Sequence, residues 1–246
     1  LTTSRDVEAQ RFSALALANT SCAELHRVEI ALQENSLMHL TEYIRNEEAD
    51  IVGRQYCAMA LGNLAADPEN HSNIAMIGGI EALMILLKLG AKEQDLESGR
   101  FAAFSLSNLA ANSNYRKQIV DEGAIEPLIL LACSDDYNVQ RQALAALRGI
   151  CISSEYRVVA VEAGILDPLV LMARSENVEI IREVAAALNC LSSAVENKEE
   201  VSDRAISTII VMLLKGDRIV ERHACCAIAN LAEISENHSR LLDENG

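Results

Sequence analysis

Histidine and cysteine are the residues of this sequence best suited to catalysis or metal binding, and their spacing favours neither. The five His residues form no H-E-x-x-H motif, and the seven Cys residues include no C-x-x-C pair. His223 and Cys226 lie one helical turn apart, a spacing that a buried cysteine on a helix explains better than a ligand pair does. The sequence also lacks the G-x-S-x-G, Walker A and dinucleotide-binding fingerprints. We therefore predict that the protein is not an enzyme and holds no metal or cofactor.

Asparagine recurs in a sequence phrase that suits binding to a peptide backbone. The phrase Ala/Ser-Leu-x-Asn-Leu occupies residues 60–64 and 105–109, and related forms occur elsewhere in the chain. Its fourth position recurs every 40 to 45 residues, at Asn19, Asn63, Asn108, Gly149, Cys190 and Asn230. A carboxamide both donates and accepts hydrogen bonds, so these asparagines can hold an extended peptide of any sequence. Alternatively, each Asn bonds the backbone of the neighbouring repeat. Gly149 and Cys190 interrupt the row of asparagines, so a continuous peptide track is in doubt.

A second phrase, interleaved with the first, indicates where helices begin and end. Gly-Ala-Ile-Glu-Pro-Leu at 123–128 has counterparts that begin at Gly78 and Gly164, whereas the counterpart that begins at Arg204 lacks the glycine. A glycine at this position favours a left-handed backbone conformation after a short helix. Apolar residues at three- and four-residue steps predict further helices, and no segment alternates as a strand does. Each repeat is therefore predicted to contain a short, a medium and a longer helix, the last carrying the asparagine.

The predicted repeats form a single domain over residues 1–246. A partial repeat at 1–22 comes first and a second partial repeat at 236–246 comes last. The five full repeats between them span about 23–67, 68–112, 113–153, 154–194 and 195–235. Because one such unit cannot bury its apolar face alone, the units must stack into a solenoid with a concave and a convex side. The linker from Lys88 to Ser98, with an insertion at 94–97, is longer than its counterparts and is expected to be a mobile loop.

These two phrases resemble the armadillo repeat, and the resemblance covers essentially the whole chain. It implies an all-α, right-handed superhelical armadillo (ARM) solenoid of three-helix repeats. It also implies a protein-binding scaffold or adaptor that holds partner segments in a concave groove lined by the third helices. The stretch from Ala60 to Asp67, followed by Glu69 and Asn70, is similar to lipid-anchored vacuolar armadillo proteins and to the armadillo-repeats-only proteins of parasites.

That subfamily resemblance implies a cytoplasmic protein on the cytosolic face of an organelle membrane. An acylated N-terminus would tether it there, and it would recruit motor or signalling proteins. Because the sequence begins with Leu1 rather than Met, we expect a piece of a longer protein whose membrane contact is indirect, through an anchor outside this sequence.

The groove residues follow from helix geometry. Positions four and seven before the asparagine lie about 40° and 20° from it around a helix, so all three share one face. All three Phe residues of the chain fall on this face, in its N-terminal half. They either receive an apolar partner segment or pack between successive third helices as core. The predicted partner-binding residues are Phe12, Asn19, Tyr56, Met59, Asn63, Phe101, Phe104, Asn108, Gln142, Glu183, His223 and Asn230.

A line of arginines is predicted to flank the groove. Its members are Arg11, Arg54, Arg100, Arg141, Arg182 and Arg222. They can bind carboxylates or phosphates of a partner, or pair with Asp and Glu of the adjacent repeat, which we favour. No Trp stands four residues before the asparagine, where import adaptors of the family carry one to hold Lys stems. Recognition of nuclear localisation signals is therefore not expected.

Composition limits the classes of partner. Lys and Arg number 21 against 36 Asp and Glu, and the net charge of −15 disfavours nucleic acid and anionic lipid. No apolar run reaches the ~20 residues that a membrane-spanning helix needs. Seven cysteines without a disulfide framework favour a reducing compartment. Protein or peptide segments remain the expected partners of a monomer, or of a weakly self-associating chain. The alternative function is a structural solenoid module that self-associates and has no dedicated groove ligand.

Overall fold

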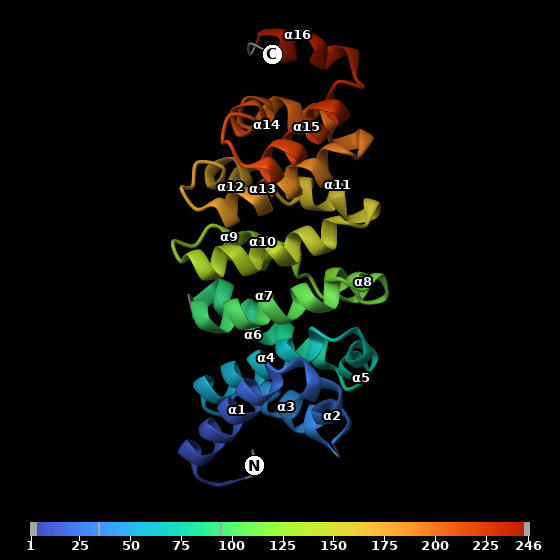
Figure 1. The fold of residues 1–246 in the computed structure, drawn as a ribbon. Coiled ribbons are helices and arrows are strands. Elements are labelled where there is room, and N and C mark those ends of the chain that lie inside the picture. The colour runs from blue at the N-terminus through green and yellow to red at the C-terminus, as the bar shows by residue number, and fades with distance from the viewer. Residues whose placement is uncertain (1–3, 34, 94, 244–246) are drawn as a thin grey trace. The chain divides into compact units, whose positions relative to one another are not determined.

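The structure, a computed structural model, describes residues 4–33, 35–93 and 95–243, apart from the side chains of residues 93 and 243. Within these ranges the regular elements are α-helices and short 3-10 helices, and there are no strands. The chain divides into two compact units, residues 1–146 and 147–246, with the boundary inside helix α10 (Tyr137–Cys151) (Figure 1). Each unit is described by itself.

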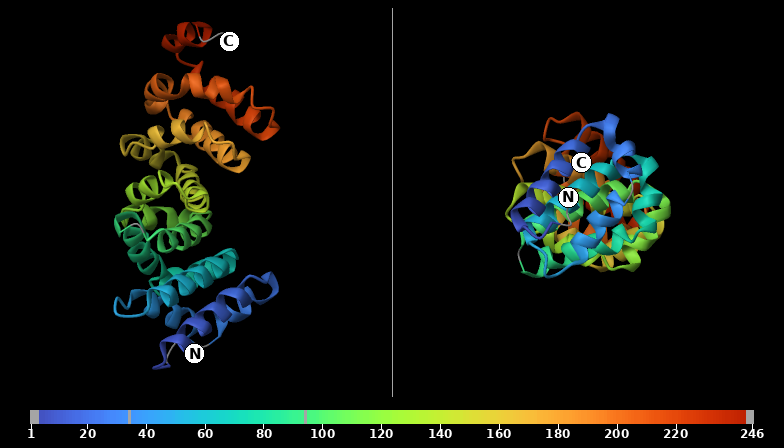
Figure 2. Two further views of the ribbon diagram at one scale, coloured as in Figure 1. Left: turned by 90° about the vertical axis from the view of Figure 1, so that its left-hand side faces the viewer. Right: turned by 90° about the horizontal axis from the view of Figure 1, so that it is seen from below.

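The first unit contains a leading helix followed by three-helix groups. The leading helix is α1 (Val7–Ser21). The first group comprises η1 (Glu24–His26), α2 (Arg27–Leu32), α3 (Ser36–Arg45) and α4 (Ile51–Ala65). The second group comprises η2 (Pro68–Asn70), α5 (His71–Met76), α6 (Gly79–Glu93) and α7 (Leu96–Ala110). The third group comprises α8 (Ser113–Asp121), α9 (Ile125–Ala132) and the start of α10. The leading helix and the last helix of the first two groups pack one on the next, α1 on α4 and α4 on α7 (Figure 2). The predicted helical class is confirmed.

The second unit continues the pattern with one departure. Its elements are the end of α10, α11 (Ser154–Glu162), α12 (Leu166–Met172), α13 (Val178–Ser192), η3 (Val195–Asn197), α14 (Lys198–Met212), α15 (Arg218–Leu231), η4 (Ser235–Asn237) and α16 (His238–Asp243). Helix α13 packs on α15, as the corresponding helices of the first unit do. The departure is α14, a single helix where the other groups have a short and a medium one.

The backbone conformation of one residue decides whether a group has two separate helices before its third helix or the single helix α14. The predicted glycine turns are confirmed, because Gly78, Gly123 and Gly164 have φ of 74°, 80° and 89°. In the first group the corresponding residue is Asn35, with φ of 62°, and Asn tolerates this conformation better than most residues. Arg204 stands at this place in the fifth group, and the chain continues through it as α14 without a turn.

Helix α6 differs from its counterparts in length. It has 15 residues, against 10 in α3, 8 in α9 and 7 in α12. The long linker from Lys88 is therefore mostly extra helix rather than the expected mobile loop, although residue 94 of the insertion lies outside the described residues. Gly90 on this extension approaches Gly99 of α7 so closely that a Cβ on Gly90 would lie 2.4 Å from the Gly99 Cα. The close approach requires glycine at this crossing.

Apolar burial accounts for the most hydrophobic segment of the chain. In the described ranges, no single helix has the length and apolar composition needed to cross a membrane. The segments Pro68–Met76 and Gly79–Lys92 meet the criterion only together, with an 84° bend between them. The second segment buries Ile80, Leu83 and Leu87 fully, and this burial explains its apolar composition.

The left-handed turns predict how substitutions at Gly123 affect stability. A Cβ at Gly123 would meet no atom within 4 Å, so Gly123→Ala adds backbone strain alone, about 1–2 kcal/mol. Gly123→Asn should lose less, because Asn35 adopts the same conformation in the first group. Urea unfolding followed by circular dichroism measures both. Equal losses for Ala and Asn would contradict the assignment of strain to this turn.

Candidate functional site

The candidate site is the third-helix face, which we define by the leading helix α1 and by the last long helix of each following group, called the third helix. It comprises the asparagine position of α1, α4, α7, α10, α13 and α15 and the positions four and seven residues before it. In the first unit, α1, α4 and α7 pack side by side and bring these positions together. In the second unit, α13 and α15 do the same. The assignment of this face as a binding site stays a prediction.

The asparagines connect consecutive third helices. Asn63 Nδ2 donates to the Ala18 carbonyl oxygen at 2.8 Å, and Asn108 Nδ2 donates to that of Gly62 at 2.9 Å. In the second unit, Asn230 Nδ2 lies 3.1 Å from Ser192 Oγ. Each bond joins one third helix to the preceding one, as the alternative interpretation of the row expects. These asparagines therefore fix the stacking of the repeats, whatever else they bind.

Two phenylalanines of α7 do not point fully outward. Phe101 is only 7% exposed, and the Arg100 guanidinium carbon lies 4.0 Å from the centre of its ring. The ring of Phe104 lies against Gly62 of α4, where a Cβ would come within 2.6 Å of Phe104 Cδ1. Phe104 remains partly exposed. Sequence reasoning missed the role of Gly62, although its position inside the asparagine phrase was a usable signal.

The remaining apolar members of the first unit are accessible. Phe12 is 67% exposed on α1, and Tyr56 and Met59 of α4 are half-buried. Asn19 is also exposed, one turn from the end of α1. With Phe104, these side chains give the face of the first unit an apolar and partly aromatic surface.

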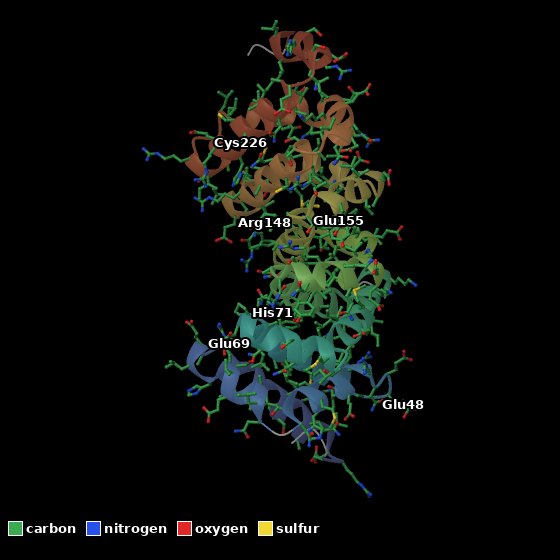
Figure 3. All side chains as sticks on the ribbon, turned by 90° about the vertical axis from the view of Figure 1, so that its right-hand side faces the viewer. Glu48, Glu69, His71, Arg148, Glu155 and Cys226 are labelled. Carbon is green, nitrogen blue, oxygen red and sulfur yellow. The ribbon has the colours of Figure 1, made fainter. Side chains whose placement is uncertain are left out.

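The face of the second unit carries small or polar residues, and two of its polar members bond side chains that lie beside the face. Arg148 Nε donates to Glu183 Oε2 at 2.6 Å, and Arg148 is labelled in Figure 3. Asn189 Nδ2 lies 3.3 Å from Nδ1 of His223. Burial, followed by the charges of Arg222 and Arg148, lowers the pKa of His223. Gln142, on the first-unit part of α10, is half-buried.

Two arginines of the predicted line pair with an aspartate that caps the next third helix. Arg11 binds Asp50, which accepts from the Gly53 amide at the start of α4. Arg182 Nη2 lies 2.7 Å from Asp217 Oδ2, and Asp217 accepts from two amides at the start of α15. The Arg182 hydrogen bond, with those amides, lowers the pKa of Asp217 to about 2. Pairing with the adjacent repeat is thus the role of these two arginines in the free chain.

The other arginines of the line have different surroundings. Arg54 is buried and donates from Nε to the Ile44 carbonyl oxygen at 2.8 Å. Arg100 pairs with Glu97 of its own helix. Arg141 is half-buried and Arg222 is exposed. Five of these arginines stand eight residues before the asparagine position and Arg54 stands nine before it, and the six side chains make different interactions.

Cysteine and metal chemistry find little support in the geometry. The described residues contain no cluster of three or more His, Cys, Asp or Glu side chains that could hold a metal ion. Burial raises the pKa of Cys57 and of Cys151 to about 12, which disfavours the reactive thiolate. Cys226, labelled in Figure 3, is exposed on α15.

Comparison with known proteins agrees with this architecture. The family model of the Armadillo/beta-catenin-like repeat matches residues 112–152 and 153–192. An engineered protein solved by the Northeast Structural Genomics Consortium is 28% identical, with a TM-score of 0.86 over 95% of this chain and 94% of that one. No curated protein matches the sequence.

Two designed proteins share the fold at lower identity. The designed armadillo repeat protein YIII(Dq)4CqI is 21% identical, with a TM-score of 0.84 over 93% of this chain and 96% of that one. A second designed armadillo repeat protein, in complex with peptide (KR)4, is 20% identical, with a TM-score of 0.82 over 93% and 95% of the two chains.

The fold defines the class as a solenoid of stacked helical repeats. More narrowly, the fold is similar to that of designed armadillo repeat proteins, and the family model of the Armadillo/beta-catenin-like repeat matches two repeats within residues 112–192.

The asparagine bonds predict unequal effects of two alanine substitutions. Asn63 is 9% exposed, and Asn63→Ala removes a buried hydrogen bond between third helices, so it should lower the free energy of unfolding by about 1 kcal/mol. Asn19→Ala, on the exposed end of α1, is the matched control and should change little. Thermal and urea unfolding give both values. Equal stability of the two variants would contradict the connecting role.

The Arg182–Asp217 pair predicts a pH dependence. The pKa of Asp217 in the folded chain lies below its ordinary value of 3.8. The contribution of its ion pair to the free energy of unfolding is therefore fully present above about pH 4 and is lost as pH falls toward 2. Arg182→Gln should therefore be less stable than the parent chain, by a margin that narrows over that range. Urea titrations at a series of pH values measure the margin, with Arg222→Gln as control. A margin that widens on acidification would contradict the pairing.

Proposed function

We propose that this chain is a non-enzymatic scaffold that holds segments of partner proteins on its third-helix face. The observation that supports this most is the accessible apolar surface made by Phe12, Tyr56, Met59 and Phe104 on adjoining third helices. Aromatic and Met side chains are enriched at the centres of protein interfaces. A repeat solenoid offers such a surface over several units, which suits a long peptide segment.

The ligand follows from charge and surface chemistry together. The chain carries a net charge of −15, which attracts a basic segment over a distance of about one Debye length. The apolar surface on α1, α4 and α7 adds a preference for apolar side chains. One designed armadillo repeat protein is in complex with peptide (KR)4, so a protein of this fold can take a basic peptide. We therefore propose a segment that combines basic and apolar residues.

We further propose that the full protein acts in the cytoplasm, on the cytosolic face of an organelle membrane. There it would recruit motor or signalling proteins, and the proposal depends on the subfamily resemblance of residues 60–70 alone. Fractionation and imaging of the full-length protein in its own cells test it. Uniform distribution without membrane association would refute the membrane role and leave peptide binding unaffected.

Binding measurements on two methionine variants test the scaffold proposal. Peptides are selected from a random linear library against the parent chain, and their dissociation constants are measured by fluorescence anisotropy. Met59→Ala should weaken binding about tenfold, because Met59 is expected to contribute more to the binding free energy than an average interface residue does. Met76→Ala is the matched control, because Met76 is 79% exposed on α5, away from the third helices. It should leave affinity within experimental error.

Two outcomes would contradict the proposal. One is a selection that yields peptides insensitive to Met59→Ala and to Tyr56→Ala. The other is a chain that selects no peptide and whose molar mass by light scattering rises with concentration, which would favour the structural, self-associating alternative. A monomer that binds peptides through α4 supports the scaffold.

A further inference from the structure

A pocket in the first unit lies apart from the third-helix face. It has a volume of about 530 Å³ and opens between the start of α4 and the last two turns of α6. Lys88, Leu89 and Lys92 line it, and Leu89 and Lys92 belong to the extension that makes α6 longer than its counterparts. The extra helix therefore builds a wall that the shorter second helices α3, α9 and α12 lack.

Arg54 is the unusual residue of this pocket. Its side chain is 5% exposed, yet it lines the pocket. Its Nε donates to the Ile44 carbonyl oxygen at 2.8 Å, whereas Nη2 is buried and has no hydrogen-bond partner among the described residues. Burial lowers the pKa of Arg54, which expresses the cost of holding this charge away from water. A buried cation with an unmatched N–H is stabilised by an anion that reaches it.

The two acidic residues of the pocket do not meet this need. Asp95 accepts from Ser98 Oγ at 2.6 Å and from Gln55 Nε2 at 3.1 Å, and it caps the start of α7. Glu47 is exposed, and no hydrogen bond joins it to Arg54 within the described part of the chain. Arg54 therefore faces the pocket with its charge unpaired by a direct contact.

The charges and the apolar lining specify a class of ligand. Among the described side chains of the pocket, the three cations Arg54, Lys88 and Lys92 outnumber the two carboxylates by one, so this lining suits a monoanion better than a phosphate dianion. Planar carboxylates also match the guanidinium geometry. The rest of the lining is aliphatic, from Ile51, Ile85 and Leu89. A short aliphatic chain attached to the anion would cover these side chains.

We propose that this pocket binds the carboxylate of a ligand with a short aliphatic chain, with the Arg54 guanidinium as the main partner of the carboxylate. The ligand is either a free aliphatic acid or the terminal carboxylate of a peptide that ends in an aliphatic residue. This site is separate from the third-helix face and does not depend on the function proposed for that face.

Side-chain NMR of the full chain labelled with ¹⁵N-arginine tests the site directly. Three probes are titrated: valerate, the peptide acetyl-Gly-Ser-Gly-Leu with a free carboxylate, and the same peptide with an amidated end. Valerate or the acid peptide should shift the Arg54 Nη signals saturably, with a dissociation constant no weaker than about 10 mM. Valerate alone identifies a free acid as the ligand source, whereas a tenfold preference for the acid peptide identifies a chain terminus. The amidated peptide should not bind.

Variants separate the pocket from general charge effects. Arg54→Gln should weaken binding about tenfold or more, the effect expected for a charged hydrogen bond. Because that change can disturb folding, Lys88→Gln with Lys92→Gln provides a second, exposed test and should weaken binding at least threefold. Lys117→Gln on α8 is the matched control and should have no effect. The proposal is overturned by unshifted Arg54 signals, by equal binding of the amidated peptide, or by binding of inorganic phosphate in preference to valerate.

Discussion

Within each unit, third helices pack on one another, and this contact holds the repeats together. A single repeat has one helix with an apolar stripe and too little chain to cover it, so its stability comes from its neighbour. Helices α1, α4 and α7 in the first unit, and α13 and α15 in the second, meet this requirement. Side-chain carboxamides and capping aspartates reinforce the same contact, since Asn63, Asn108, Asp50 and Asp217 all connect consecutive third helices.

This arrangement divides the third-helix face between stability and binding. Phe101 and Asn63 are buried, and Asn63 bonds the preceding third helix. Tyr56, Met59 and Phe104 stay partly exposed and remain available to a partner. The third-helix face also differs in chemistry between the two units. It is apolar in the first unit, whereas in the second unit Glu183 on this face forms an ion pair with Arg148. A partner that uses both units must therefore present different side chains to each.

Much of the fold could be predicted from the sequence because the repeat pattern is redundant. The glycine at 78, 123 and 164 marks the turn by a backbone requirement that few other residues meet. The turn was harder to predict at two other positions. Asn35 forms the turn without a glycine, whereas at Arg204 the helix continues and there is no turn. The site was less predictable. Helix periodicity places Phe101 and Phe104 on one face, but only Gly62 on the neighbouring helix decides how Phe104 packs. The α6 extension looked like a loop because its length alone does not reveal its helix.

Hydrogen exchange of the free chain, measured by mass spectrometry, tests whether the contact between third helices stabilises the fold. If the contact between third helices holds the structure together, amides of α4 and α7 exchange most slowly in the first unit, because only unfolding of the stack exposes them. The short helices α5 and α8 exchange faster. Exchange in α4 and α7 as fast as in α5 and α8 would contradict the account.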